Sequence, residues 1–254
     1  QQALQQAVQE KQQAIQEKQQ AVDRLAALLG LQKVVVAEKK TSPAHPPASA
    51  LKAVGVVFQD SLQGGSKGPL MVVVSPGRFQ IGSNLFEYEK NGPVVTIGKP
   101  FAVGKYPITV AQYLAAVDAG QCREPEWREA GSEYHYRTGS YDLYRKMGQS
   151  LLGEHFPIVG ISWDDAKAWI KWINAARKDK GGVYRLLSEA EWEYCARAGS
   201  TGHWCHGDDE ACLADYGWHK KNSDGHTHAV GEKAVNAFGL FDMHGNVWEW
   251  VEDG

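Results

Sequence analysis

The chain has 254 residues, of which 43% are hydrophobic and 22% are charged. This length and composition suffice for one sizeable globular domain with an extension. The net charge of −3 and the isoelectric point near 6.3 argue against a nucleic-acid partner, because they leave no basic footprint for phosphates. No apolar run approaches the roughly 18 residues that predict a membrane span. The cellular compartment stays open.

Residues 1–30 are predicted to form an amphipathic, weakly coiled-coil helix. Lys11 and Lys18 interrupt the d positions, so only weak self-association is expected. Two interpretations remain: an oligomerising or spacer helix, and a solvated helix that leads into the domain. An apolar residue occupies every seventh position, as the a positions of a coiled coil require: Val8, Ile15, Val22 and Leu29.

Residues 31–50 contain three prolines and are predicted to be a linker. The remainder, residues 51–254, is predicted to form one α+β domain. Short β-branched runs separated by glycine and proline predict its first strands. These runs are Val54–Phe58, Met71–Val74, Arg78–Gly82, Val94–Ile97 and Phe101–Val103.

Three later segments carry helix start signals. Thr109 precedes a stretch rich in alanine and leucine that continues to about Ala119. Ser162 and Ser188 each begin a capping-box pattern, which predicts helices that end near residues 178 and 197. From Gly199 onward the chain is rich in loop residues, and long ordered loops are usually functional or held by ions.

The cysteines and histidines give weaker signals. Cys205 and Cys212 lie in one polar loop, where they either bridge or remain two free thiols. Cys195 lies in a predicted helix and is expected to be a small buried hydrophobe. Six histidines fit no metal-binding triad and are expected on surface loops: His203, His206, His219, His226, His228 and His244.

The most informative segment is Gly239–Trp250. It combines two glycines, an amide, carboxylates and two tryptophans, which is typical of a rigid loop that forms a site. The sequence stops at Gly254, directly after this apolar stretch. We therefore expect the domain to be truncated, with its final strands lying beyond this residue.

Five blocks of sequence, in this order and spacing, resemble the formylglycine-generating, or sulfatase-modifying factor, family. The resemblance implies a C-type-lectin-like α+β fold with much irregular structure. It also implies bound calcium and a protein or peptide as substrate or ligand. The five blocks cover residues 68–82, 103–113, 157–166, 184–197 and 236–250.

Two calcium sites follow from the resemblance. The first would use the side chains of Asn246 and Glu249, with the backbone carbonyls of His244 and Val247. The second would use Asp215, the carbonyl of Tyr216 and a group near residues 222–224. Oxygen ligands that converge in a turn suit a hard cation. In the alternative interpretation, Asn246 and Glu249 only cap a turn and satisfy buried amides.

Catalytic members of the family oxidise a substrate cysteine to formylglycine with oxygen and a copper ion held by two cysteines. A thiolate pair suits Cu(I). The resemblance places that pair beyond the Trp-Glu-Trp turn, so none of the four cysteines here is predicted to be catalytic. Two hypotheses follow. The full-length protein is a formylglycine-generating oxidoreductase, which would need copper, or it is a non-catalytic, calcium-stabilised binding or regulatory module.

Overall fold

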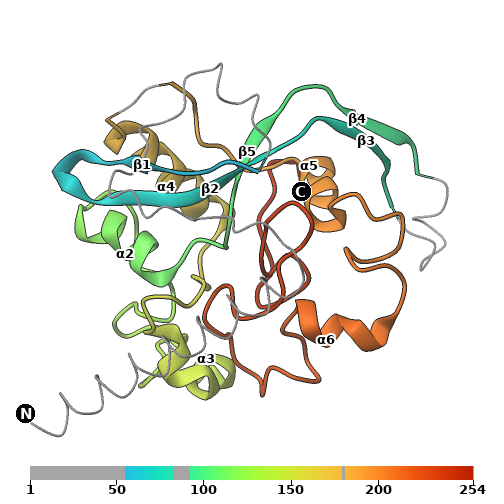
Figure 1. Cartoon of the computed structure of the whole chain (residues 1–254). Coiled ribbons are helices and arrows are strands. Elements are labelled where there is room, and N and C mark those ends of the chain that lie inside the picture. Colours follow the sequence, from blue (N-terminus) through green and yellow to red (C-terminus); the bar gives the residue numbers. More distant parts are fainter. Residues whose placement is uncertain (1–54, 83–91, 179–180, 254) are drawn as a thin grey trace, which may run out of the picture. The chain divides into compact units, whose positions relative to one another are not determined.

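The structure is a computed structural model that describes residues 55–82, 92–178 and 181–253 (Figure 1). The helix expected over residues 1–30 and the linker over 31–50 lie outside the described residues and stay predictions. Within the described part, helices and two small antiparallel sheets are joined by long irregular segments. The mixed α+β class is therefore confirmed. No helix in these ranges is long and apolar enough to cross a membrane.

The larger sheet has three antiparallel strands in the order β1-β2-β5. They span β1 (Val57–Ser61), β2 (Lys67–Val74) and β5 (Phe101–Gly104). In the central strand β2, Val72 pairs with Val57 on one side and with Val103 on the other. The sheet leaves β5 as an outer strand, which matters for the site described below.

Strand β2 begins earlier than the sequence predicted, at Lys67 rather than at Met71. The pattern Gly68-Pro69 is typical of a break in a strand. In the structure the strand continues through these residues, because the pairing of β1 with β2 is irregular between Gln59 and Ser61. A bulge of this kind lets a strand continue past a proline that cannot donate a ladder hydrogen bond.

The smaller sheet pairs β3 (Gly77–Gln80) with β4 (Val94–Ile97). It lies beside α5 (Glu189–Arg197) in Figure 1. A Cβ atom at Gly77 would collide with the Tyr194 side chain of α5. Glycine at this position therefore allows the strand to approach the helix closely.

The three predicted helices are confirmed, and each begins directly after its expected cap. They are α2 (Val110–Asp118), α4 (Trp163–Ala176) and α5. In each case a serine or threonine hydroxyl accepts the N3 backbone N–H while the N3 side chain accepts the N-cap N–H. The three capping boxes are Thr109 with Gln112, Ser162 with Asp165, and Ser188 with Glu191.

Short helical segments were not predicted from the sequence. Two are α-helical, α3 (Asp142–Met147) and α6 (Leu213–Tyr216), and neither has a side-chain cap. Without a cap or a full apolar face, such short helices depend on tertiary contacts. The part of the chain that the structure describes also contains three 3₁₀ turns: η2 (Gln63–Gly65), η4 (Gly148–Leu151) and η5 (Glu210–Cys212).

Two apolar clusters form the framework around the site. One joins α2 to α4 through Tyr113, Ala116, Trp169 and Ile173. The other joins β2 and β5 to α5 and the C-terminal segment, and its buried members are Val72, Val74, Val103, Tyr194, Cys195, Ala196, Leu240 and Met243. Cys195 is fully buried in this second cluster, as the sequence predicted.

A buried ion pair ties β1 to the residue after α4. The Asp60 carboxylate and the Arg177 guanidinium are each 1% exposed, and Oδ2 of the first lies 2.8 Å from Nε of the second. Tyr184 adds a hydrogen bond by donating its hydroxyl proton to Asp60 Oδ2 at 2.9 Å. This network fixes one wall of the cavity described next, because Tyr184 lines it.

Candidate functional site: an apolar groove beside a buried-carboxylate turn

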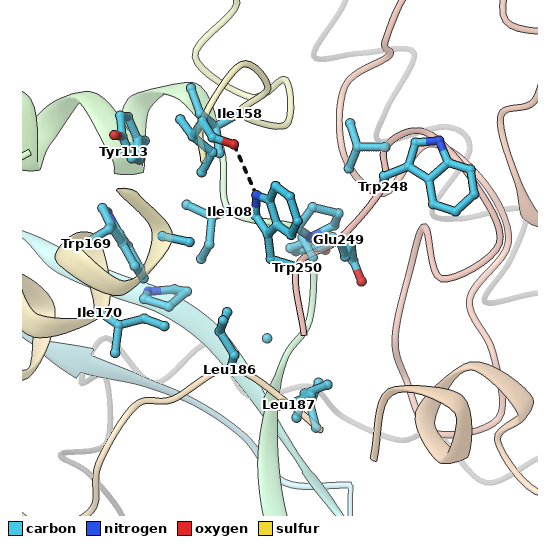
Figure 2. Close-up of a pocket in the computed structure, with 18 of the residues that line it drawn as sticks. Ile108, Tyr113, Ile158, Trp169, Ile170, Leu186, Leu187, Trp248, Glu249 and Trp250 are labelled. Atoms are coloured by element: carbon cyan, nitrogen blue, oxygen red, sulfur yellow. Dashed lines mark hydrogen bonds between the residues drawn. The ribbon is translucent and has the colours of Figure 1, made fainter. Parts of the chain in front are cut away.

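A groove of about 650 Å³ opens between β5, α4 and the turn Trp248–Trp250 (Figure 2). Its walls are mainly aliphatic and aromatic side chains, which is typical of sites that bind apolar groups. The wall residues labelled in Figure 2 include Ile108, Tyr113, Ile158, Trp169, Ile170, Leu186, Leu187 and Trp250. They come from segments far apart in the sequence, so no local pattern indicates the groove.

The two tryptophans of the turn behave differently. Trp250 is 50% exposed, and its indole N–H donates to the Ile161 carbonyl at 3.1 Å, which holds the ring at the groove. Trp248 is fully exposed and lies apart from the other labelled side chains in Figure 2. Trp250 is therefore a fixed part of the wall, whereas Trp248 is a large apolar group presented to solvent.

An outer strand of the larger sheet contributes to the groove wall. Ala102, Val103 and Gly104 of β5 line it, and β5 pairs only with β2 among the described strands. In an antiparallel ladder, alternate backbone groups of an outer strand point away from its neighbour. The groove thus combines an outer strand of the sheet with apolar walls.

Among the residues that line the groove, Asn246 joins two loops through its side chain. Its Oδ1 accepts the His228 N–H at 2.9 Å, and its Nδ2 donates to the His228 carbonyl at 3.0 Å. The Asn246 N–H donates to the Trp218 carbonyl at 2.8 Å. Asn246 also has a positive φ of 68°, a conformation that asparagine tolerates better than most residues. These contacts correspond to the turn-capping role that was one of its two interpretations.

Two carboxylates lie in the same turn: Asp242, which is buried and was not predicted, and Glu249, which is partly buried. Asp242 is 3% exposed; its Oδ2 accepts the Gly231 N–H at 2.8 Å, but its Oδ1 is buried with no hydrogen-bond partner. Glu249 accepts the Trp192 indole N–H at 2.6 Å. Burial raises the pKa of the Asp242 carboxyl, while hydrogen bonding by the Gly231 N–H and by the nearby Asn246 side chain reduces this rise. Burial, together with the charge of Asp242, also raises the pKa of Glu249.

The carboxylates of this turn bear on the calcium ion that the resemblance implies here. An unpartnered buried carboxylate oxygen is costly unless a cation or donor meets it, and Asp242 supplies such an oxygen. Val247 and His244 lie in the same turn, where their carbonyls could add to the carboxylates. Among residues 55–82, 92–178 and 181–253, no three His, Cys, Asp or Glu side chains converge as a metal-ligand group. A calcium site here would therefore need carbonyl oxygens beside its two carboxylates.

The residues of the second predicted calcium site lie in and beside α6. Asp215 is exposed, and its backbone carbonyl accepts the Ala234 N–H at 2.8 Å. The Tyr216 ring stacks on the His206 ring, with centroids 4.9 Å apart. The two predicted sites are neighbours, because the Asn246 N–H reaches the Trp218 carbonyl directly after this helix.

His206 and His244 differ from the surface histidines that were expected. Both ring nitrogens of His206 are buried without a hydrogen-bond partner, and His244 Nε2 accepts the Cys205 N–H at 3.0 Å. Burial, with a smaller contribution from His206, lowers the pKa of His244 to about 4. The surface expectation was wrong for these two residues because the loops around residues 205 and 244 pack on one another.

The four cysteines are free thiols, so Cys205 and Cys212 do not form a bridge. Burial raises the pKa of Cys122 and of Cys205, and raises that of Cys195 to about 12. The nearby Asp209 carboxylate raises the pKa of Cys212. A copper site of the family type needs thiolates. In the metal-free protein, these raised pKa values favour the protonated thiol over the thiolate.

Comparison with known proteins shows the family. The profile described as "Sulfatase-modifying factor enzyme 1-like domain" matches residues 58–254. The chain therefore belongs to this family, also called FGE-sulfatase. A solved structure, PvdO from Pseudomonas aeruginosa, is 32% identical with a TM-score of 0.59, covering 79% of this chain and 75% of that one.

Two curated relatives are equally similar but carry different names. The formylglycine-generating enzyme of Mycobacterium tuberculosis is 29% identical over 234 residues, covering 71% of this chain and 73% of the relative. The bovine (Bos taurus) protein named inactive C-alpha-formylglycine-generating enzyme 2 is also 29% identical, over 235 residues, covering 71% of this chain and 69% of the relative. Overall identity therefore does not separate a catalytic from a non-catalytic role.

Proposed function

We propose that this chain is a calcium-stabilised binding domain of the sulfatase-modifying factor family that holds an extended polypeptide in its groove. The observation that carries this proposal is the groove itself, which combines apolar walls with the outer edge of β5. An extended peptide can pair its backbone with such an edge while its alternate side chains enter apolar pockets. The family's C-type-lectin-like architecture is part of the same proposal, supported by the small sheets and long irregular segments.

Calcium is proposed at the turn that borders the groove. Asp242 and Glu249 would supply carboxylate oxygens, and the carbonyls of His244 and Val247 would complete the set. The unpartnered Oδ1 of Asp242 supports this assignment. Asn246 would act beside the ion by holding the neighbouring loop, since its amide already bonds to His228. A divalent cation here would neutralise two carboxylates that burial disfavours in their charged forms.

The binding proposal is tested with a synthetic sulfatase peptide that contains a substrate cysteine. Titration of the peptide, followed by calorimetry, should show saturable binding. Leu186→Asp places a charge in the groove and should weaken binding at least about tenfold. The matched control is Val183→Asp, three positions earlier at an 81% exposed site outside the groove, which should bind normally. No saturable binding, or equal binding by both variants, would refute the proposal.

Formylglycine generation is the second candidate, favoured by the similarity to the Mycobacterium tuberculosis enzyme. It would require a thiolate pair for copper, and the resemblance places that pair beyond the Trp-Glu-Trp turn. With the same peptide and copper supplied, we expect binding without oxygen consumption. Oxygen uptake together with aldehyde formation on the peptide would instead support the catalytic candidate.

A further inference from the structure

The turn at Asp215 and Tyr216 is where the family resemblance implies a second calcium ion, yet the protein already uses oxygen atoms there. The Asp215 carbonyl accepts the Ala234 N–H at 2.8 Å. The Asp215 side chain is exposed. A calcium ion takes six to eight oxygen ligands, so one exposed carboxylate offers little of what it needs.

The loop that should complete this site is closed on itself. Asn222 Oδ1 accepts the His219 N–H at 2.6 Å, and Asn222 Nδ2 donates to the Gly217 carbonyl at 3.1 Å. Asp224, the other acidic residue of this loop, is exposed. The residues present do not fit a second calcium ion.

A positively charged side chain, that of Lys233, nevertheless lies at this turn. Lys233 Nζ donates to the Ala214 carbonyl at 2.7 Å, directly before Asp215. The same nitrogen lies 3.8 Å from the centroid of the Trp218 ring. The Lys233 side chain is partly buried, which strengthens a cation–π contact relative to one in open solvent. The ammonium thus meets a carbonyl and an aromatic face together.

We propose that the Lys233 ammonium is the built-in cation of this turn and takes the place of a second metal ion. One segment makes two adjacent contacts: Lys233 bonds to the Ala214 carbonyl through its side chain, and Ala234 bonds to the Asp215 carbonyl through its N–H. A divalent ion beside the ammonium would be repelled by it. The chain should therefore bind calcium at the Asp242 and Glu249 turn alone.

The lysine also supports the turn that is proposed to hold calcium. The Trp218 ring stacks on the His228 ring with centroids 3.6 Å apart and planes 9° apart. The His228 backbone is in turn held by the Asn246 amide. Lys233 therefore fixes one face of Trp218, and loss of its charge should loosen both loops.

Calcium stoichiometry tests the first part of the inference. Chelator-treated protein should bind one equivalent in calorimetry, and Asp242→Asn should abolish that binding. Asp215→Asn, a matched change at the other turn, should leave the single equivalent intact. A second equivalent that is lost in Asp215→Asn would overturn the inference. No binding at all would refute the site at Asp242 and Glu249, and the role of Lys233 would then be decided by amide exchange.

Amide exchange tests the lysine directly. Lys233→Met keeps the aliphatic stem but removes the charge, so residues 213–218 and 226–234 should exchange roughly tenfold faster, with or without calcium. Lys221→Met is the control, because that side chain is 78% exposed and pairs only with Glu210 at the surface. The inference would be overturned if amide protection were unchanged in Lys233→Met, or if calcium restored the protection that this variant loses. Circular dichroism confirms that each variant is folded.

Discussion

The Asn246 side chain holds the His228 backbone from both sides, because its amide accepts the N–H at 2.9 Å and donates to the carbonyl at 3.0 Å. The same residue has a left-handed backbone with a φ of 68°. Both requirements favour asparagine, which combines an acceptor, a donor and tolerance of positive φ. One residue therefore sets the shape of its own turn and the position of the loop that carries His228.

Asn246→Ala should destabilise the protein by about 3 kcal/mol, because two hydrogen bonds are lost and alanine is strained at positive φ. Asn246→Gly removes the bonds without the strain and should cost about 2 kcal/mol. Urea denaturation at saturating calcium measures both values. An alanine variant as stable as the unsubstituted protein would contradict this role of the Asn246 side chain in holding the His228 backbone.

Calcium should stabilise the protein increasingly as the pH rises. Burial raises the folded-state pKa values of Asp242 and Glu249 above their ordinary values of 3.8 and 4.5. In metal-free protein, their contribution is present below these ordinary values and is lost as the pH rises through the raised ones. Calcium offsets this loss because it neutralises the ionised carboxylates.

The measurement is the thermal midpoint with chelator and with calcium, between about pH 4 and pH 8. The gap between the two curves should widen with pH in the unsubstituted protein and stay small in Asp242→Asn. Glu154→Gln serves as a control, because this exposed carboxylate lies outside the proposed ligand set and does not contribute to the pKa shifts of Asp242 or Glu249. A gap that is independent of pH, or one that persists in Asp242→Asn, would count against the site.

His244 should give a pH dependence of the opposite sign. Its pKa falls from 6.5 to about 4, mainly through burial, so the unfolded chain takes up a proton before the folded one. Its contribution to stability is complete above pH 6.5 and is lost as the pH falls toward 4, by up to about 3 kcal/mol. His244→Gln should flatten this part of the stability curve. His155→Gln, at an exposed imidazole, should leave it unchanged.

The sequence predicted those features that depend on neighbouring residues. Thr109, Ser162 and Ser188 mark helix starts because each cap bonds within its own first turn. The α+β class likewise follows from periodicity and strand propensity. Asp242 was missed because its burial depends on Gly231 and on the fold of the whole loop. A carboxylate three residues before the Gly245-Asn246 pair was the available signal.

The groove could not be predicted from the sequence either, for a different reason. Its walls come from β5, α4 and the Trp250 turn. These segments are far apart in the sequence, and a local sequence pattern does not predict contacts between such distant segments. His206 and His244 were misjudged in the same way, because a histidine in a polar loop gives no sign that another loop will cover it. Long-range packing decides these cases, and it acts on residues whose local environment is uninformative.

The buried pair of Asp60 and Arg177 should be the most sensitive site for stability. Arg177→Met removes the guanidinium that faces the buried Asp60 carboxylate, and should cost about 3 to 5 kcal/mol. Asp60→Asn combined with Arg177→Met should cost less than the two single changes together, because no uncompensated charge remains. Urea denaturation of the three variants tests this coupling. Since Tyr184 also lines the groove, Arg177→Met should weaken peptide binding as well. If the costs in stability are additive and peptide binding is normal, the network of Asp60, Arg177 and Tyr184 contributes neither coupled stability nor the shape of the groove.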